Sequence, residues 1–141
     1  MAEPYTVLVV DDVDVVRHTA NRILTKEGYL VLEATDADEA LAVLSARRAK
    51  VDLVLLDVVL PDRDGVALYA DICARWPRIP VVFMSAYAAE ILAARGQEDL
   101  TVPFLAKPFT REQLTAKVGV AIERRRSPRE PRTSGPQPMT T

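Results

Sequence analysis

Short apolar runs alternate with amphipathic segments along most of the chain. Five runs rich in valine, leucine and isoleucine are too short for helices and predict strands. The expected strands are residues 5–10, 30–34, 53–56, 80–84 and 102–106. Apolar residues at helical spacing follow each of them. The expected helices are residues 13–27, 37–48, 66–75, 88–95 and 110–125. Strict alternation of strand and helix predicts an α/β domain with a parallel sheet covered by helices on both faces.

Several residues predict where the helices begin and end. Gly28 follows the first helical segment, as a C-terminal capping glycine would. Asp36 and Thr110 precede the second and the last helical segments and are typical N-cap residues. Residues 61–65 are dense in turn-forming types and lead into the third helix. The predicted alternation therefore has chemically sensible boundaries.

Ionisable or hydroxyl side chains follow four of the five predicted strands. They are Asp11 and Asp12, Asp57, Ser85 and Lys107. The carboxyl ends of parallel strands share one edge of an open α/β sheet, which is where such sheets bind ligands. Carboxylates crowded there repel one another unless protons or a hard divalent cation offset their charge. The pattern therefore predicts a Mg²⁺ site, with a lysine suited to binding anionic phosphoryl oxygens.

Composition narrows the class of protein. The chain has 141 residues, 49% of them hydrophobic, which suits one domain with one core. Residues 123–141 hold five arginines and two glutamates, a charge of +3, so the net charge of −2 leaves −5 for residues 1–122. The acidic excess argues against a nucleic-acid-binding face there. The proline-rich residues 127–141 predict a disordered tail after a domain of residues 1–126.

Two further features favour a cytoplasmic protein. Cys73 is the single cysteine, so no disulfide can form within the chain, as suits a reducing compartment. No apolar run is long enough to cross a bilayer, and the first residues do not resemble a signal peptide. We therefore expect no membrane contact.

Five segments together resemble a known family. They are residues 7–12 (VLVVDD), 55–61 (LLDVVLP), 64–65 (DG), 84–86 (MSA) and 107–110 (KPFT). In this order and spacing they resemble the receiver domain of bacterial two-component response regulators, the group that includes the chemotaxis response regulator. The likeness runs from about residue 5 to residue 125. Each segment alone is a modest signal, but their coincidence with the predicted elements is a strong one.

The resemblance implies a fold and a set of roles. The fold would be a flavodoxin-like (βα)5 sandwich with strand order 2-1-3-4-5, which places the first and third strands side by side. Asp57 would accept a phosphoryl group from a histidine kinase or a histidine phosphotransfer protein. Asp11, Asp12, Asp57 and the backbone carbonyl of Val59 would bind or position Mg²⁺, while Lys107 and Ser85 would contact phosphoryl oxygens.

The same resemblance implies a conformational output. Ser85 would move toward the phosphoryl group, and Phe104 would turn inward to fill the space behind it. Val59 and Tyr87 are expected to hinder a hydrolytic water, so we expect slow self-dephosphorylation. Family likeness also implies a cis bond between Lys107 and Pro108. A homodimer through the fourth helix, fifth strand and fifth helix is a further expectation.

Two other classes remain open at this point. Asp12 and Asp14 also fit the opening motif of haloacid-dehalogenase-type phosphatases, which would make the chain a turnover enzyme rather than a protein that is itself phosphorylated. That alternative leaves Asp57 unexplained, and the chain offers few acids after Lys107 to hold the metal. The other class is an interaction module that works without phosphorylation, although no member of the acidic set is missing.

Overall fold

A computed structural model describes residues 4–47, 50–86 and 103–126. Its five strands form one parallel sheet of order β2-β1-β3-β4-β5. The strands are β1 (Thr6–Val10), β2 (Leu30–Ala34), β3 (Leu53–Asp57), β4 (Val81–Ser85) and β5 (Phe104–Ala106). The helices are α1 (Asp14–Lys26), α2 (Ala37–Ala46), α3 (Gly65–Arg75) and α5 (Arg111–Arg126). The expected helix at residues 88–95 lies outside the described residues.

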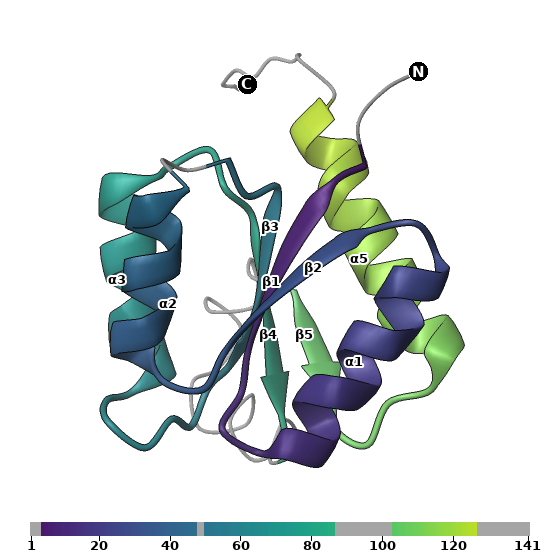
Figure 1. Ribbon diagram of the computed structural model, residues 1–141, viewed down its shortest axis with the longest axis horizontal. Helices are drawn as coiled ribbons and strands as arrows, with labels where there is room; N and C mark the ends of the chain where they lie inside the picture. The colour runs from purple at the N-terminus through teal and green to yellow at the C-terminus, as the bar shows by residue number, and fades with distance from the viewer. Residues whose placement is uncertain (1–3, 48–49, 87–102, 127–141) are drawn as a thin grey trace.

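Two pairs of helices enclose the sheet. Helices α2 and α3 cover one face, and α1 and α5 cover the other (Figure 1). Each face has its own apolar cluster, one centred on Leu56 and Ile72 and the other on Leu55 and Leu114. Because both faces are covered, every residue of β1, β3 and β4 is buried, which explains their nearly uninterrupted apolar sequences. The three-layer α/β sandwich and its strand order are confirmed.

Helix ends follow the predicted capping residues. Asp36 accepts a hydrogen bond from the backbone N–H of Glu39 at 2.8 Å. The Thr110 hydroxyl accepts from the N–H of Gln113, whose side chain accepts from the N–H of Thr110, as in a capping box. Gly28 has a φ of 96°, a conformation that only glycine adopts readily, directly after α1. Local sequence signals therefore set the ends of these helices.

Most boundaries agree with the sequence prediction to within one residue, and the following differences are the informative ones. Strand β4 runs from Val81 to Ser85 rather than from residue 80 to 84, because proline has no N–H to donate and Pro80 offers only its carbonyl, to Val54. Helix α2 ends at Ala46 and not at residue 48. Strand β5 begins at Phe104; residue 102, where a fifth strand was expected to begin, is outside the described residues. The expected tail at residues 127–141 is also outside them.

Among the described residues, no helix is long and apolar enough to cross a membrane.

Candidate functional site

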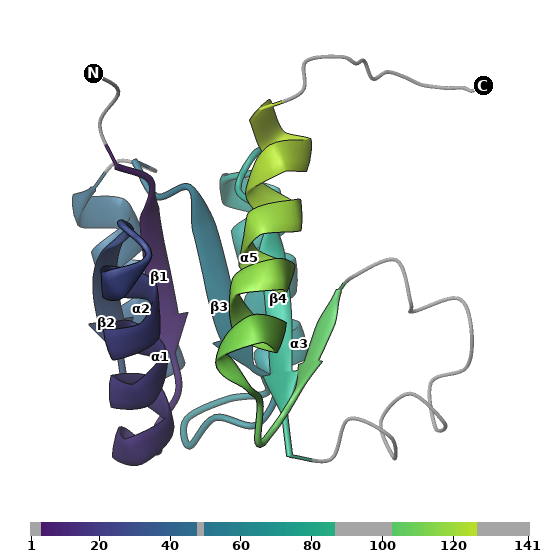
Figure 2. The same ribbon diagram turned by 90° about the vertical axis from the view of Figure 1, so that its right-hand side faces the viewer.

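The carboxyl edge of the sheet gathers acidic side chains from two neighbouring strands. Strands β1 and β3 pair in register from Val7 with Leu53 to Val10 with Leu56, so Asp11 and Asp57 follow at the same edge. Asp11 and Asp57 are buried and Asp12 is exposed. One carboxylate oxygen from each of the three lies within 4.8 Å of the others. The arrowheads of β1 and β4 point toward this edge, which is the lower one in Figure 2.

Lys107 joins the two buried carboxylates. Its Nζ lies 2.8 Å from Oδ2 of Asp57, to which it donates a hydrogen bond, and 2.6 Å from Oδ2 of Asp11. Its side chain is 12% exposed. The Lys107 backbone N–H donates to the carbonyl of Ser85 at 2.9 Å, which fixes the end of β5 against β4. The Lys107–Pro108 bond is cis, as predicted.

Burial and charge act in opposite directions on this pair. Burial raises the pKa of Asp57, and the negative charge of Asp11 adds to that rise, while hydrogen bonds from Lys107 and from the Val59 N–H oppose it. Burial would lower the pKa of Lys107, but its contacts with Asp11 and Asp57 outweigh burial and raise it. Lys107 is therefore a cation held between two acids, and its hydrogen bond and charge favour the charged form of Asp57.

The donor set fits a hard divalent cation. Oδ2 of Asp11 is buried and accepts no hydrogen bond of acceptable angle from the described residues, because the contact with Lys107 is close but poorly aligned. One lysine faces two buried acids, and the exposed carboxylate of Asp12 lies beside them. Three carboxylates thus face one ammonium, and carboxylate oxygens are ligands that Mg²⁺ prefers. Asp11, Asp12 and Asp57 could therefore hold it.

The loop after β3 is fixed through its backbone. Oδ1 of Asp57 accepts a hydrogen bond from the Val59 N–H at 3.0 Å, and the Val59 side chain is exposed. The Gly65 N–H donates to the Val58 carbonyl at 2.8 Å. A Cβ at Gly65 would lie 2.4 Å from the carbonyl oxygen of Asp57, so only glycine fits there without a shift. This close approach brings the N-terminus of α3 against the end of β3.

Ser85 and Phe104 occupy the places that a switch would need. Ser85 is buried at the end of β4, beside the residues that lead to Lys107. Phe104 is half-buried at the start of β5, and its ring lies 5.5 Å from that of Phe83. Their movement stays a prediction. Tyr87, expected to hinder hydrolysis, lies outside the described residues.

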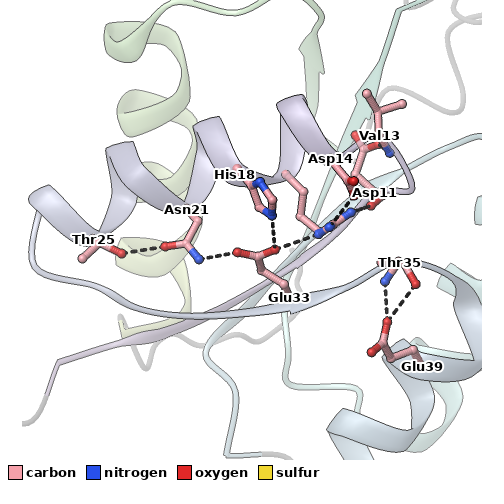
Figure 3. A network of polar contacts seen from close by, with 10 residues as sticks. Asp11, Val13, Asp14, His18, Asn21, Thr25, Glu33, Thr35 and Glu39 are labelled. Atoms are coloured by element: carbon pink, nitrogen blue, oxygen red, sulfur yellow. Dashed lines mark hydrogen bonds and ion pairs between the residues drawn. The ribbon is translucent and has the colours of Figure 1, made fainter.

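Sequence reasoning missed three charged residues beside the site. Arg17 is buried at the start of α1 and contacts Asp11, Asp14 and Glu33. Figure 3 shows the Glu33 carboxylate next to His18 and Asn21 of α1. Asp62 accepts hydrogen bonds from the backbone N–H groups at the start of α2. The residues around a charged side chain in a helix or a loop do not indicate which distant residue it will contact.

A family model agrees with this arrangement. The model for the response regulator receiver domain matches residues 7–119. The chain belongs to this family. The segments that suggested the resemblance supply the acids, the serine and the lysine that the sheet brings to one edge.

Related receiver domains occur in proteins of several kinds. The sensor kinase CckA of Brucella abortus is 38% identical over 119 residues, 84% of this chain and 13% of that protein. The KDP operon transcriptional regulatory protein KdpE of Escherichia coli is 32% identical over 94% of this chain and 56% of its own length. The chain thus spans little more than half, or much less, of these curated relatives.

Solved receiver structures share the fold. A signal receiver domain of an HD domain-containing protein from Pseudomonas fluorescens Pf-5 has a TM-score of 0.78 and 26% identity, covering 89% of this chain and 91% of its own. The receiver domain of the hybrid histidine kinase CckA has a TM-score of 0.70 and 33% identity, covering 83% and 98%. These similarities extend across the receiver fold.

The phosphatase alternative gains no support in this family. Asp14 lies in the first turn of α1 with its side chain 74% exposed, paired with Arg17. That hydrogen bond and the positive charge of Arg17 lower the pKa of Asp14, so it is poorly suited to donate a proton as the acid of such an enzyme. His18 is exposed, as predicted. Asp14 therefore belongs to the contacts around Arg17 and not to the acidic cluster.

Proposed function

We propose that Asp57 accepts a phosphoryl group from the phosphohistidine of a cytoplasmic histidine kinase or histidine phosphotransfer protein. The observation that carries the proposal is the contact of Lys107 with both Asp57 and Asp11, beside Asp12. A carboxylate oxygen of Asp57 attacks phosphorus, the phosphorus–nitrogen bond breaks, and its electron pair stays on the donor imidazole. The product is an acyl phosphate on Asp57.

The surrounding residues supply charge and orientation rather than a catalytic proton. The carboxylates of Asp11, Asp12 and Asp57 and the carbonyl of Val59 would hold Mg²⁺, which when bound offsets the negative charge of the phosphoryl oxygens. The Lys107 ammonium, held at this edge, pairs with one phosphoryl oxygen. The Ser85 hydroxyl donates to another. Positioning accounts for most of the rate, because the phosphohistidine already carries a labile phosphoryl group.

The output is a change of surface and not turnover of a separate substrate. We propose that Ser85 moves toward the phosphoryl group and that Phe104 turns inward from the edge strand β5. The altered face, formed by β5 and α5, binds a downstream protein or a second copy of the chain. The protein catalyses only its own phosphorylation and dephosphorylation.

Labelling the acceptor tests the proposal. The purified chain is incubated with acetyl phosphate and Mg²⁺, or with phosphorylated histidine kinases, and mass spectrometry locates the phosphoryl group. We expect it on Asp57 in the wild type and in Asp52→Asn, which alters an acid at the opposite end of β3, and no labelling of Asp57→Asn. Labelling of Asp12 instead, or no labelling and no binding of beryllofluoride, would overturn the proposal.

The lifetime of the acyl phosphate tests the roles of Val59 and Tyr87. Val59 is apolar and exposed next to the acceptor, so it offers no hydrogen bond to an attacking water. We expect slow decay in the wild type and faster decay in the double variant Val59→Asn with Tyr87→Glu. Equal decay rates in the wild type and the double variant would show that these two residues do not slow hydrolysis.

A further inference from the structure

We propose that Arg17 is a positioning residue that holds the acidic loop between β1 and α1 in its metal-binding conformation. The inference rests on the proposed function of the site, but it concerns a residue outside the acids, the serine and the lysine. Arg17 contacts neither Asp57 nor Lys107 through any described hydrogen bond or ion pair. It would act through the backbone of Asp11.

The burial of Arg17 is the first observation. Arginine is rarely buried without partners, yet Arg17 is only 6% exposed. Each of its three nitrogens donates to a different residue. Nε donates to Oε1 of Glu33 at 2.7 Å, Nη1 to the carbonyl of Asp11 at 2.9 Å, and Nη2 to Oδ1 of Asp14 at 2.6 Å. The rigid planar guanidinium therefore joins β2, the acidic loop and α1.

The contacts of Asp11 are the second observation. Its backbone N–H donates to the carbonyl of Ala34 at 3.1 Å, and its Oδ1 accepts from the N–H of Val13 at 2.9 Å. Its carbonyl accepts from Arg17. Only Oδ2 is left without a well-aligned hydrogen bond, and it lies 2.6 Å from the Lys107 ammonium, which also contacts Asp57. Arg17 thus completes a set of contacts in which Oδ2 of Asp11, beside its ion pair with Lys107, is the oxygen of this residue that could also contact a cation.

The anchor on β2 makes the arrangement rigid. The second oxygen of Glu33 accepts a hydrogen bond from Asn21, which in turn accepts from the hydroxyl of Thr25, and Figure 3 shows these side chains in a row along α1. Glu33 is therefore held from α1 by hydrogen bonds from Arg17 and Asn21, as well as by the sheet. A guanidinium fixed to such an anchor cannot swing away when a cation binds. Outer residues that orient metal ligands commonly change metal affinity by 10- to 100-fold when altered.

The test separates positioning from general stabilisation. Arg17→Lys keeps the charge, but a single ammonium cannot reproduce the guanidinium's planar, three-nitrogen contact with Glu33, Asp11 and Asp14. Arg22→Ala removes an exposed cation from the same helix and controls for charge. Asp52→Ala controls for stability, because Asp52 accepts from the Thr6 N–H at the opposite end of β1. Binding of Mn²⁺ is followed by electron paramagnetic resonance at a temperature where all four proteins are folded.

A second measurement uses the metal-free protein. Amide hydrogen exchange of Asp11 and Val13 reports the loop itself, without metal or phosphate. We expect Arg17→Lys to weaken Mn²⁺ binding about tenfold and to speed exchange of these two amides. We expect wild-type Mn²⁺ affinity in Arg22→Ala and Asp52→Ala, with exchange at Asp11 and Val13 changed no more than at distant sheet amides.

Each result has a definite meaning. Equal Mn²⁺ affinity and equal loop exchange in Arg17→Lys and in the wild type would overturn the inference. So would a loss of affinity in Asp52→Ala as large as that in Arg17→Lys, because stability alone would then explain it. Failure of Asp57 to become phosphorylated in a wild-type protein that binds Mn²⁺ would instead reject the proposed function. The two ideas can therefore fail separately.

Discussion

The two loops that carry the acids are held by different means. The loop after β1 is tied by a buried cation, Arg17, which reaches across to Glu33 on β2. The loop after β3 is tied by carboxylates that cap helices, Asp62 at the start of α2 and Asp64 at the start of α3. One anchor is a side chain buried in the protein, and the other consists of exposed acids on backbone N–H groups.

The difference follows from the neighbours of each loop. The loop after β1 lies next to β2, which supplies Glu33. Arg17 can therefore bind both the Glu33 carboxylate and the carbonyl of Asp11 in the loop. The loop after β3 lies between two helix N-termini, where N–H groups need acceptors and partial positive charge favours carboxylates. Each loop is therefore fixed by a charge opposite to that of the neighbouring element. A cation faces the acid on β2, and carboxylates face the positive N-termini of α2 and α3.

Removing the cation that links both loops should have the largest effect. Lys107→Met leaves Asp11 and Asp57 buried beside each other without Lys107, at a cost of about 3 kcal/mol in the free energy of unfolding. Adding Mg²⁺ should recover part of that loss, because it binds only the folded protein. Urea unfolding with and without Mg²⁺ measures both quantities. Lys117→Met, on the exposed side of α5, should have little effect; an equal loss there would contradict the prediction.

The second-largest loss of stability should come from adding a side chain at Gly65, at the end of the loop after β3. Gly65→Ala places a Cβ against two backbone carbonyls and should cost about 2 kcal/mol, since backbone cannot move aside as a flexible side chain would. Gly119→Ala is the matched control, because a Cβ there meets nothing within 4 Å and the residue lies inside α5. It should stabilise the protein by up to about 1 kcal/mol. Thermal unfolding that shows the same sign for both variants would refute this reasoning.

The anchor of the first loop should show a pH dependence. Burial opposes the charge of Glu33, but hydrogen bonds from Asn21 and Arg17 outweigh it and lower its pKa. A lowered pKa in the folded protein means that the charge contributes stability above the ordinary titration range of glutamate, near pH 4.3, and that this is lost as the pH falls through the folded pKa.

The measurement compares Glu33→Gln with the wild type across pH. We expect a loss of about 1 kcal/mol at pH 7 and a smaller loss near pH 3, from urea unfolding at each pH. Glu112→Gln, on the exposed first turn of α5, should be neutral at both. A loss for Glu33→Gln that stays constant down to pH 3 would show that its charge is not involved.

The anchor of the second loop should matter least for stability. Asp62 is exposed, and hydrogen bonds from the backbone of Ala37 and Asp38 lower its pKa. Asp62→Ala should lower the melting temperature slightly, less than Glu33→Gln does. Asp38→Ala, in the first turn of the same helix, is the control. The comparison of the two loops would fail if Asp62→Ala proved more damaging than Glu33→Gln at pH 7.

Much of the fold and of the candidate site followed from local sequence. Apolar runs bounded by capping residues located four of the expected helices and all five strands to within a few residues. A charged residue directly after a buried strand is also a local signal, and it singled out Asp57 and Lys107. The strand order came from resemblance to a family rather than from pattern, since periodicity does not say which strands are neighbours.

The contacts that hold the site depend on how distant segments pack together. Lys107 meets Asp57 across 50 residues of sequence, and Arg17 meets Glu33 across 16. Local pattern reports the preferences of each segment for helix, strand or turn. Which charges become partners depends on which segments pack together and how far water is excluded between them. Local sequence therefore sets where the elements and their polar ends lie, whereas packing buries Arg17 of α1 against the carbonyl of Asp11.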